Sequence, residues 1–133
     1  MEHHQSTIVD VLRQSLPGLM AVYAFGSRVH DTADQSSDLD LAALGDGYID
    51  VHTLWDLGAR IADIVGFDVD LLDLRAASTV MQYQILARGE RWWCGDPRAG
   101  LFEAAMLSEK TELDRARADL LDQIKAEGRV HGR

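Results

Sequence analysis

The sequence predicts an α/β protein with a small mixed β-sheet flanked by helices and a long C-terminal helix. Short apolar segments of strand length alternate with segments whose apolar residues recur at helical spacing. Glycine, aspartate and proline separate these segments. The last third of the chain is highly charged and carries one apolar stripe, which is typical of a surface helix. At 133 residues the chain is expected to form one domain, residues 1–133.

The first two elements lead into a tight turn. Ser6 is expected to cap a helix that runs to about Leu16 and ends at the Pro17-Gly18 pair. An apolar run, Val22 to Phe25, follows and stops abruptly at Gly26. This pattern is typical of a buried strand that enters a tight turn.

The turn has the features of a phosphate-binding loop. Ser27 occupies the position of a helix N-cap, and the short segment Arg28 to Thr32 follows it. Free backbone N–H groups at a helix start bind anionic oxygens, and Gly26 lets a phosphate approach because it has no side chain. Arg28 could add a charged fork to the outermost phosphate. Gly26, Ser27 and Arg28 are therefore the candidate nucleotide-binding residues.

Two aspartates follow this turn after ten residues. Read as a strand, the segment Asp38 to Leu44 places Asp38 and Asp40 on one face, because side chains alternate along a strand. Two such carboxylates repel each other unless a cation lies between them. Magnesium prefers oxygen ligands, so Asp38 and Asp40 are candidate metal ligands.

A third carboxylate is expected from the segment Gly66 to Leu74, which we predict to be a strand. Asp70 is flanked by apolar residues, and an aspartate in such a place is costly unless it is paired or binds metal. Asp68 lies nearer the start of the strand, where solvation is easier, and Asp73 lies nearer its end. Asp70 is the most central of the three and is the candidate that we prefer.

The elements between and after these strands also have clear boundaries. Asp50 is expected to cap a helix over Val51 to Ile64, which Gly66 ends. A further helix is expected from about Ala77 to Arg88, ending at Gly89.

The C-terminal part is predicted to be a short edge strand followed by a long helix. On the strand, Arg91 to Cys94, the adjacent Trp92 and Trp93 should face opposite ways, one into the core and one outward. The helix should span about Pro97 to Glu127. Its first half is expected to pack on the sheet, and its second half could lie against a partner. The stripe consists of Phe102, Ala105, Met106, Leu113, Ala116, Leu120 and Ile124.

The composition restricts the kinds of partner and the cellular location that we expect for this protein. The net charge of −9, with no evident basic patch, disfavours free nucleic acid as the substrate. The single cysteine, Cys94, cannot form an internal disulfide, so a reducing cytoplasm is the expected location. No signal peptide or apolar run of membrane length is apparent.

The spacing of the motif resembles that of a known family. The motif resembles that of the nucleotidyltransferase superfamily, which includes DNA polymerase beta. It consists of Gly26-Ser27, ten intervening residues, Asp38-x-Asp40 and the later Asp70. The small size and Arg28 make the chain similar to minimal nucleotidyltransferase (MNT) antitoxins of HEPN/MNT toxin–antitoxin pairs. The stretch QYQILARGERWWCGD and the terminal GRVHGR are also similar to that family.

The resemblance implies a nucleotidyltransferase fold and a metal-dependent reaction. By this likeness Asp38, Asp40 and Asp70 are catalytic and hold two Mg²⁺ ions, while Gly26 and Ser27 hold the outer phosphates of ATP. Two ions in such a site stabilise both the entering and the leaving oxygen. Asp70 could also help to take the proton of the acceptor. The implied partner is a HEPN ribonuclease toxin, which receives AMP on a tyrosine hydroxyl and can form a hetero-oligomer with this chain.

Two other functions stay open at this point. The chain could be a non-catalytic antitoxin whose acidic surface covers the basic RNA-binding groove of a toxin. It could instead transfer AMP to a small hydroxyl compound such as an aminoglycoside, although no segment is left over for a drug-binding domain. Whether the acceptor is a toxin tyrosine or a small compound, a chain this short needs another molecule to supply the acceptor hydroxyl.

Overall fold

The computed structural model describes the backbone of residues 2–26 and 38–131 and the side chains of residues 4–26 and 38–126. The short helical segment expected from Arg28 to Thr32 lies outside these ranges. The described elements follow the predicted order of helices and strands. In chain order they are α1 (Glu2–Ser15), β1 (Leu19–Phe25), β2 (Leu39–Gly45), α2 (Val51–Val65), β3 (Val69–Asp73), the 3-10 helix η1 (Leu74–Ala76), α3 (Thr79–Arg88), β4 (Glu90–Cys94) and α4 (Arg98–His131).

The four strands form one mixed sheet in the order β3-β2-β1-β4. Strand β1 pairs with β2 and with β4 in antiparallel fashion, and β2 pairs with β3 in parallel fashion. The parallel pair is connected through α2, as a crossover between parallel strands requires. The predicted mixed sheet and the predicted edge position of β4 are therefore confirmed.

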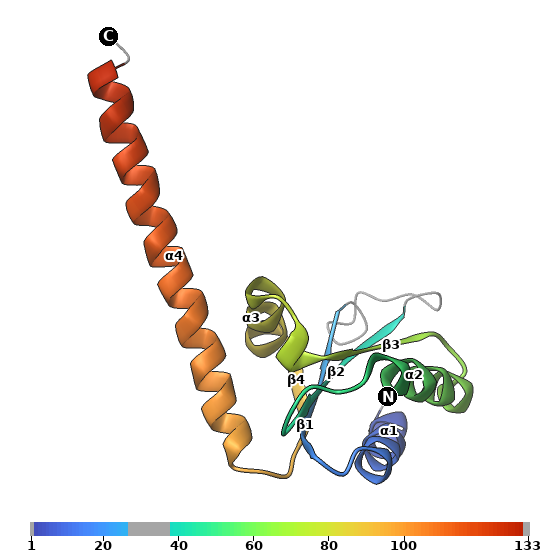
Figure 1. Cartoon of the computed structure of the whole chain (residues 1–133). Coiled ribbons are helices and arrows are strands. Elements are labelled where there is room, and N and C mark those ends of the chain that lie inside the picture. The colour runs from blue at the N-terminus through green and yellow to red at the C-terminus, as the bar shows by residue number, and fades with distance from the viewer. Residues whose placement is uncertain (1, 27–37, 132–133) are drawn as a thin grey trace.

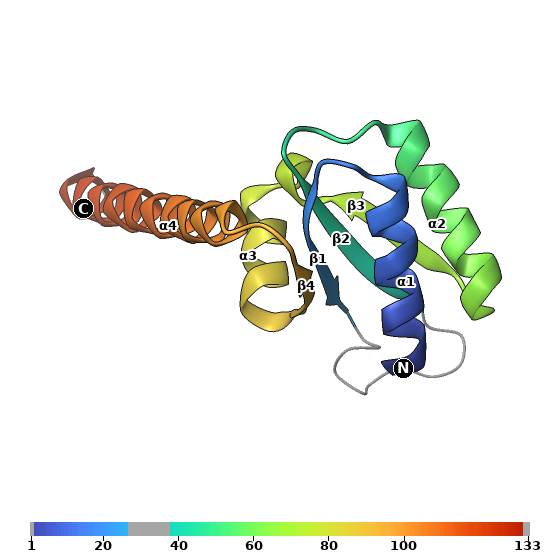
Figure 2. The same ribbon diagram turned by 90° about the horizontal axis from the view of Figure 1, so that it is seen from below.

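Helices cover both faces of the sheet. In Figures 1 and 2, α1 and α2 lie on one face, and α3 and the first turns of α4 lie on the other. On the first face the buried core joins Leu12 and Ile61 of the helices to Val22 and Leu41 of the strands. On the second face a separate core gathers Tyr23, Ala42, Ile85, Ala99 and Met106. The alternation of side chains along β1 and β2 divides the apolar residues between these two cores.

The caps of α2 form as the sequence predicts. The side chain of Asp50 accepts a hydrogen bond from the Thr53 N–H at 3.1 Å, and Gly66 ends the helix in the left-handed conformation with φ of 85°. Helix α3 begins two residues later than expected. The chain first makes the η1 turn, and Ser78 then caps α3 through the Met81 N–H.

Helix α1 differs from the prediction at its start. It begins at Glu2, so Ser6 is an internal residue and not the N-cap. Residues Glu2 to Gln5 continue the helix because they include neither glycine nor proline. The predicted end is close to the observed one, since the helix stops at Ser15, just before Pro17.

The two adjacent tryptophans do not face opposite ways. Trp92 and Trp93 are both half-buried and both pack against the core beneath α1. The pairing of β1 with β4 shifts register here, because Val22 faces Trp93 while Tyr23 faces Arg91. Trp92 is thus an extra residue in a β-bulge, which interrupts the strict alternation of side chains. The expectation of one core and one outward tryptophan is wrong for this reason.

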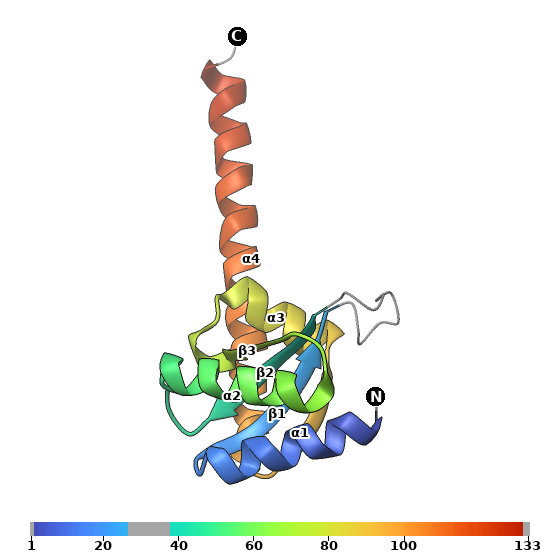
Figure 3. The same cartoon turned by 90° about the vertical axis from the view of Figure 1, so that its right-hand side faces the viewer.

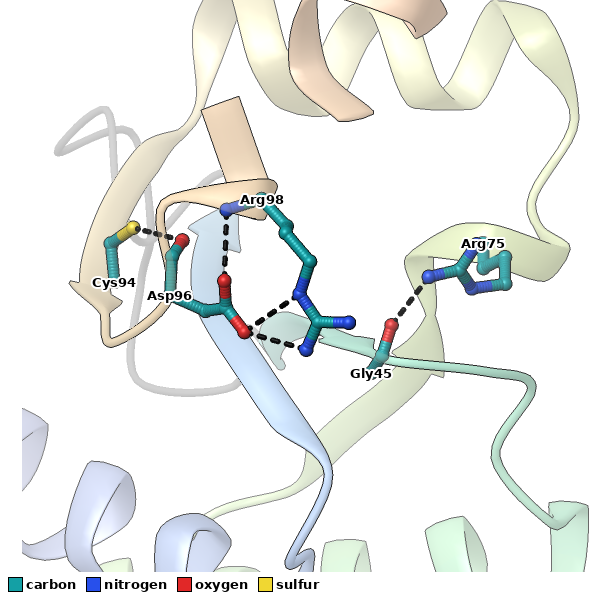
Figure 4. Close-up of polar contacts among 5 residues, drawn as sticks. All are labelled: Gly45, Arg75, Cys94, Asp96 and Arg98. Atoms are coloured by element: carbon teal, nitrogen blue, oxygen red, sulfur yellow. Dashed lines mark hydrogen bonds and ion pairs between the residues drawn. The ribbon is translucent and has the colours of Figure 1, made fainter. Parts of the chain in front are cut away.

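At the end of the sheet that is lowest in Figure 1, arginine side chains make contacts that stabilise the fold. The Arg75 guanidinium donates to the Gly45 carbonyl at 2.6 Å and stacks 4.0 Å from the centre of the Phe102 ring. Arg98 pairs with Asp96 at 2.7 Å, and the Cys94 thiol donates to the Asp96 carbonyl at 3.5 Å (Figure 4). These contacts fasten the first turns of α4 to the ends of β2 and β4.

In the described residues, the first half of helix α4 contacts the rest of the domain, as far as Lys110 over the Tyr83 ring. The Tyr23 hydroxyl donates to Glu103 at 2.6 Å, and Arg91 forms an ion pair with the same carboxylate at 3.2 Å. Met106 is buried, but Ala105 is exposed, so Ala105 does not belong to the packed stripe. From position 111 to position 126 every residue is exposed, and the helix rises away from the sheet (Figure 3). The first half therefore packs on the sheet as predicted. In the part of the chain that the structure describes, no helix has the length and apolar character needed to span a membrane.

Candidate active site

Two of the three predicted metal ligands lie side by side on neighbouring strands. Asp40 on β2 pairs in register with Asp70 on the parallel strand β3. In-register neighbours in a sheet are roughly 4.8 Å apart and project to the same face. Asp38 lies immediately before β2, two residues from Asp40, which places it toward that same face. The sheet thus brings the predicted acidic residues together.

The turn after β1 lies directly beside this acidic group. Phe25 pairs with Asp40 across β1 and β2, and Gly26 follows with φ of 85°, a backbone conformation that glycine adopts without strain. A Cβ atom at Gly26 would collide with Oδ2 of Asp40. Glycine is favoured here by the positive φ, and it also leaves room for the Asp40 carboxylate in its present position.

The pKa of the Asp40 carboxyl is raised in this position. Burial raises the pKa of the Asp40 carboxyl, and the negative charges of Asp70 and then Asp38 raise it further. Asp40 is half-buried, whereas Asp38 and Asp70 are exposed. A cation placed among the three would remove the repulsion and favour the ionised form of Asp40.

The donor set suits a hard divalent cation. Three carboxylates supply only oxygen ligands, which Mg²⁺ prefers over nitrogen or sulfur. Among residues 4–26 and 38–126, no group of three or more acidic, histidine or cysteine side chains is arranged so that it could hold a metal ion. The three carboxylates match magnesium in their chemistry, and the repulsion among them is what a bound cation would relieve.

The other two aspartates of the β3 segment have different surroundings. Asp68 is exposed and precedes the strand, where its carbonyl accepts a hydrogen bond from the Leu39 N–H at 3.0 Å. Asp73 is 6% exposed, and its two carboxylate oxygens accept the N–H groups of Ile49 and Arg75 at 2.9 and 3.0 Å. Both carboxylate oxygens of Asp73 are thus engaged by backbone N–H groups. Asp70, which is in register with Asp40, therefore remains the candidate ligand.

Two of the predicted nucleotide-binding residues, Ser27 and Arg28, lie outside the described residues. One further glycine near the turn was not identified as a site residue from the sequence. A Cβ atom at Gly89 would lie 2.7 Å from the Ala24 carbonyl oxygen and 3.2 Å from Cβ of Phe25. Gly89 therefore lets the end of α3 press against β1 just before Gly26. The sequence marked it only as a helix end.

The family of the chain follows from comparison with known proteins. The family described as "Polymerase beta, Nucleotidyltransferase" matches residues 6–98, which include the turn and all three aspartates. The chain belongs to this nucleotidyltransferase family. Its four-stranded mixed sheet and flanking helices are the nucleotidyltransferase fold that the sequence predicted.

Similar proteins within the nucleotidyltransferase family come from toxin–antitoxin pairs. The protein adenylyltransferase MntA of Shewanella oneidensis is 32% identical over 123 residues, which cover 92% of this chain and 88% of that protein. A toxin–antitoxin crystal structure with AMP-PNP contains a chain with 32% identity and a TM-score of 0.80, covering 91% of this chain and 98% of that one. A structure of tri-AMPylated Shewanella oneidensis HEPN toxin in complex with MNT antitoxin matches at 30% identity and a TM-score of 0.75, covering 93% and 98% of the two chains.

Proposed function

We propose that this protein is an antitoxin enzyme that transfers AMP from ATP to a tyrosine hydroxyl of a cognate HEPN ribonuclease toxin. The observation that carries the proposal is the register of Asp40 with Asp70 beside the Gly26 turn. Support comes from the adenylyltransferase MntA and from the solved complexes with AMP-PNP and with an AMPylated HEPN toxin.

We assign the roles within the site as follows. Asp38, Asp40 and Asp70 hold Mg²⁺, which when bound neutralises the phosphate charge and stabilises the entering and leaving oxygens. Gly26, Ser27 and Arg28 bind the outer phosphates through backbone N–H groups and the guanidinium. The site thereby orients the α-phosphorus of ATP toward an incoming hydroxyl.

The reaction is an in-line displacement at the α-phosphorus. The acceptor oxygen forms a bond to phosphorus while the bond to the bridging oxygen breaks, and pyrophosphate leaves. The acceptor proton passes to solvent or to a nearby carboxylate, for which Asp70 is the exposed candidate. The products are an AMP ester of the toxin and pyrophosphate. The added bulk and negative charge would block RNA from the toxin.

The acceptor must be supplied by another protein. We propose that residues 1–133 act as one domain, whose described helices and strands build the sheet and its two cores. We also propose the cytoplasm as its location, because ATP is available there and Cys94 is a free thiol.

The test uses the full-length protein, labelled ATP, Mg²⁺ and the HEPN-type protein encoded by the adjacent reading frame. We expect the label to appear on that protein and its ribonuclease activity to fall in parallel. The double variant Asp38→Ala, Asp40→Ala should transfer no label. Labelling that the double variant leaves undiminished would contradict the proposal, as would labelling of an aminoglycoside in place of the protein.

The same variant separates catalysis from binding. If the double variant transfers no label but still protects cells that express the toxin, neutralisation rests on binding alone. We expect it to fail to protect, because toxin that carries no AMP keeps an open active site.

A further inference from the structure

Gly89 is the single residue between helix α3, which ends at Arg88, and strand β4, which begins at Glu90. Its N–H donates to the Ile85 carbonyl at 2.9 Å and so closes the helix. Glu90, the next residue, already pairs with Ala24 of β1. The chain therefore changes from helix to strand at Gly89 without an intervening loop, and the end of α3 is joined directly to the sheet.

The backbone conformation of Gly89 does not explain why this residue is glycine. Its φ is −84° and its ψ is −177°, an extended conformation that residues with a side chain also adopt. A Cβ atom at Gly89 would lie 2.6 Å from the carbonyl oxygen of Ile85 and 2.7 Å from that of Ala24. It would also lie 3.2 Å from Cβ of Phe25. Non-bonded atoms attract at about 3.5–4.0 Å, so a methyl group here would force the backbone to move.

Helix α3 is fixed on the side that faces the sheet. Ile85 is fully buried in the core between α3 and the strands. Gln82, one turn earlier, is 7% exposed, and its side-chain amide donates to the Leu74 carbonyl at 3.1 Å. Movement of α3 away from the sheet would open this core and break this hydrogen bond. An added methyl group at Gly89 would therefore displace the strand instead.

The part of the strand that such a displacement would move is its last residue, Phe25. Ala24 is paired on both sides, with β2 and with β4, whereas Phe25 is paired only with Asp40 of β2 among the described residues. Gly26 follows directly, and it approaches Asp40 so closely that a Cβ atom there would collide with Oδ2 of the carboxylate. Displacement of Phe25 would thus change the position of the Gly26 backbone relative to Asp40.

We propose that Gly89 is a positioning residue for nucleotide binding. Because Gly89 lets α3 contact the end of β1, it holds the Gly26 backbone at the distance from Asp40 at which the turn and the carboxylates bind one metal-bound triphosphate. Gly89 itself touches no substrate. The inference rests on the proposed function, since it names what sets the spacing between the two halves of that site.

The test adds one methyl group at Gly89 and compares this variant with two controls, all in the full-length protein. Gly47→Ala adds the same group beyond the end of β2, where no described residue other than its chain neighbours comes within 4 Å of the new Cβ. Ile85→Val removes a methyl group from the same buried helix turn, so it lowers stability without pushing on β1. Urea unfolding shows how much stability each variant loses.

Isothermal titration calorimetry measures the binding of an ATP analogue with a methylene bridge between its α- and β-phosphorus atoms, in the presence of Mg²⁺. We expect Gly89→Ala to weaken this binding by about tenfold or more, since a misplacement of about 1 Å in an enzyme site can cost about a hundredfold. Both controls should bind like the wild type. Mg²⁺ alone, titrated in thermal melts, should stabilise all four proteins equally, because Asp40 and Asp70 lie on β2 and β3 whereas Gly89 contacts β1.

The transfer reaction should separate the same two effects. With the HEPN-type protein of the adjacent reading frame as acceptor, Gly89→Ala should raise the KM for ATP by a similar factor and leave the KM for the acceptor unchanged. A purely structural role would lower the amount of folded protein, and hence the apparent kcat, without changing either KM.

An unchanged affinity for the analogue in folded Gly89→Ala overturns the inference. Equal weakening in Ile85→Val also overturns it, because lost stability would then account for the effect. A parallel loss of Mg²⁺ binding overturns it as well, since the carboxylates and not the turn would then have moved.

If Gly89→Ala does not fold, NMR of the wild type decides. The amide resonance of Gly89 should shift when the analogue binds with Mg²⁺ and not with Mg²⁺ alone, whereas that of Gly47 should not shift. An unshifted Gly89 amide overturns the inference. If the wild type binds the analogue and transfers no AMP to the HEPN-type protein, the proposed function fails while the role of Gly89 stands. If the wild type does not bind the analogue, both fail.

Discussion

The carboxylate of Asp40 lies so close to the backbone of Gly26 that a single added methyl group would collide with it. The pairing of Phe25 with Asp40 across β1 and β2 brings the two residues together. A phosphate held at the turn and a cation held at the carboxylate would therefore be neighbours. The fold therefore brings together a turn and an acidic pair that are separated by ten residues in the sequence, as the proposed function requires.

Replacing Gly26 with alanine should damage both stability and transfer. The positive φ costs about 1 kcal/mol for an alanine, and the added methyl group would force the Asp40 carboxylate to turn out of its present position. Gly66→Ala is the matched control, because Gly66 has the same φ of 85° and open space around it. We expect urea unfolding to show a larger loss for Gly26→Ala, and AMP transfer to disappear only in that variant. Equal behaviour of the two variants would contradict the role given to the contact.

Replacing Asp40 with asparagine should stabilise the fold at neutral pH when no divalent cation is present. In the folded chain the pKa of Asp40 is raised by burial and by the charges of Asp70 and Asp38. Its contribution to stability is therefore complete below the ordinary pKa of 3.8 and is lost as the pH rises through the higher folded pKa.

The Asp40→Asn variant lacks this loss. The difference in the free energy of unfolding between variant and wild type, measured with urea in EDTA, should grow from acidic to neutral pH. Asp10→Asn, on the exposed side of α1, should show no such growth. A flat difference for Asp40→Asn would mean that neither burial nor the neighbouring carboxylates raise the pKa of Asp40 in the folded protein.

Magnesium should raise the Tm of the wild type, and Asp70→Asn should weaken that effect. A ligand that binds only the folded state stabilises it by about 2.7 kcal/mol at one hundred times its Kd. Asp70 is in register with Asp40, whereas Asp68 precedes the strand, so Asp68→Asn is the control on the same segment. Thermal melts over a Mg²⁺ titration should give a weaker apparent affinity for Asp70→Asn alone. A larger effect at Asp68 would reverse the assignment of the third ligand.

The hydrogen bond from Tyr23 to Glu103 should matter for the attachment of α4. Tyr23→Phe removes this buried donor, while Glu103 keeps its ion pair with Arg91. We expect the free energy of unfolding to fall by about 1.5–3 kcal/mol, as for other hydrogen bonds to a charged group. Tyr83→Phe keeps the ring that lies under Lys110 and should change stability by less than about 0.5 kcal/mol. Equal urea midpoints for both variants would show that the Glu103 contact contributes nothing to stability.

Much of the fold could be predicted because its signals are local. The cap at Asp50 and the left-handed Gly66 act within one turn of helix, so the neighbouring residues alone determine them. The start of α1 and the opposite orientation of Trp92 and Trp93 were predicted wrongly. The first depends on weak propensities over Glu2 to Gln5, and the second depends on pairing with β1, which lies far away in the sequence.

The sequence alone determined the spacing of Gly26, Asp38 and Asp40 and the presence of a later strand aspartate. These features depend only on the order of residues along the chain and on the alternation of side chains within a strand. The tertiary structure decided which aspartate of the β3 segment lies beside Asp40. It puts Asp70 in register with Asp40 and commits Asp73 to two backbone N–H groups. It also decided where α4 leaves the domain. Register and packing arise between segments that are distant in sequence, and only the folded sheet brings these segments into contact.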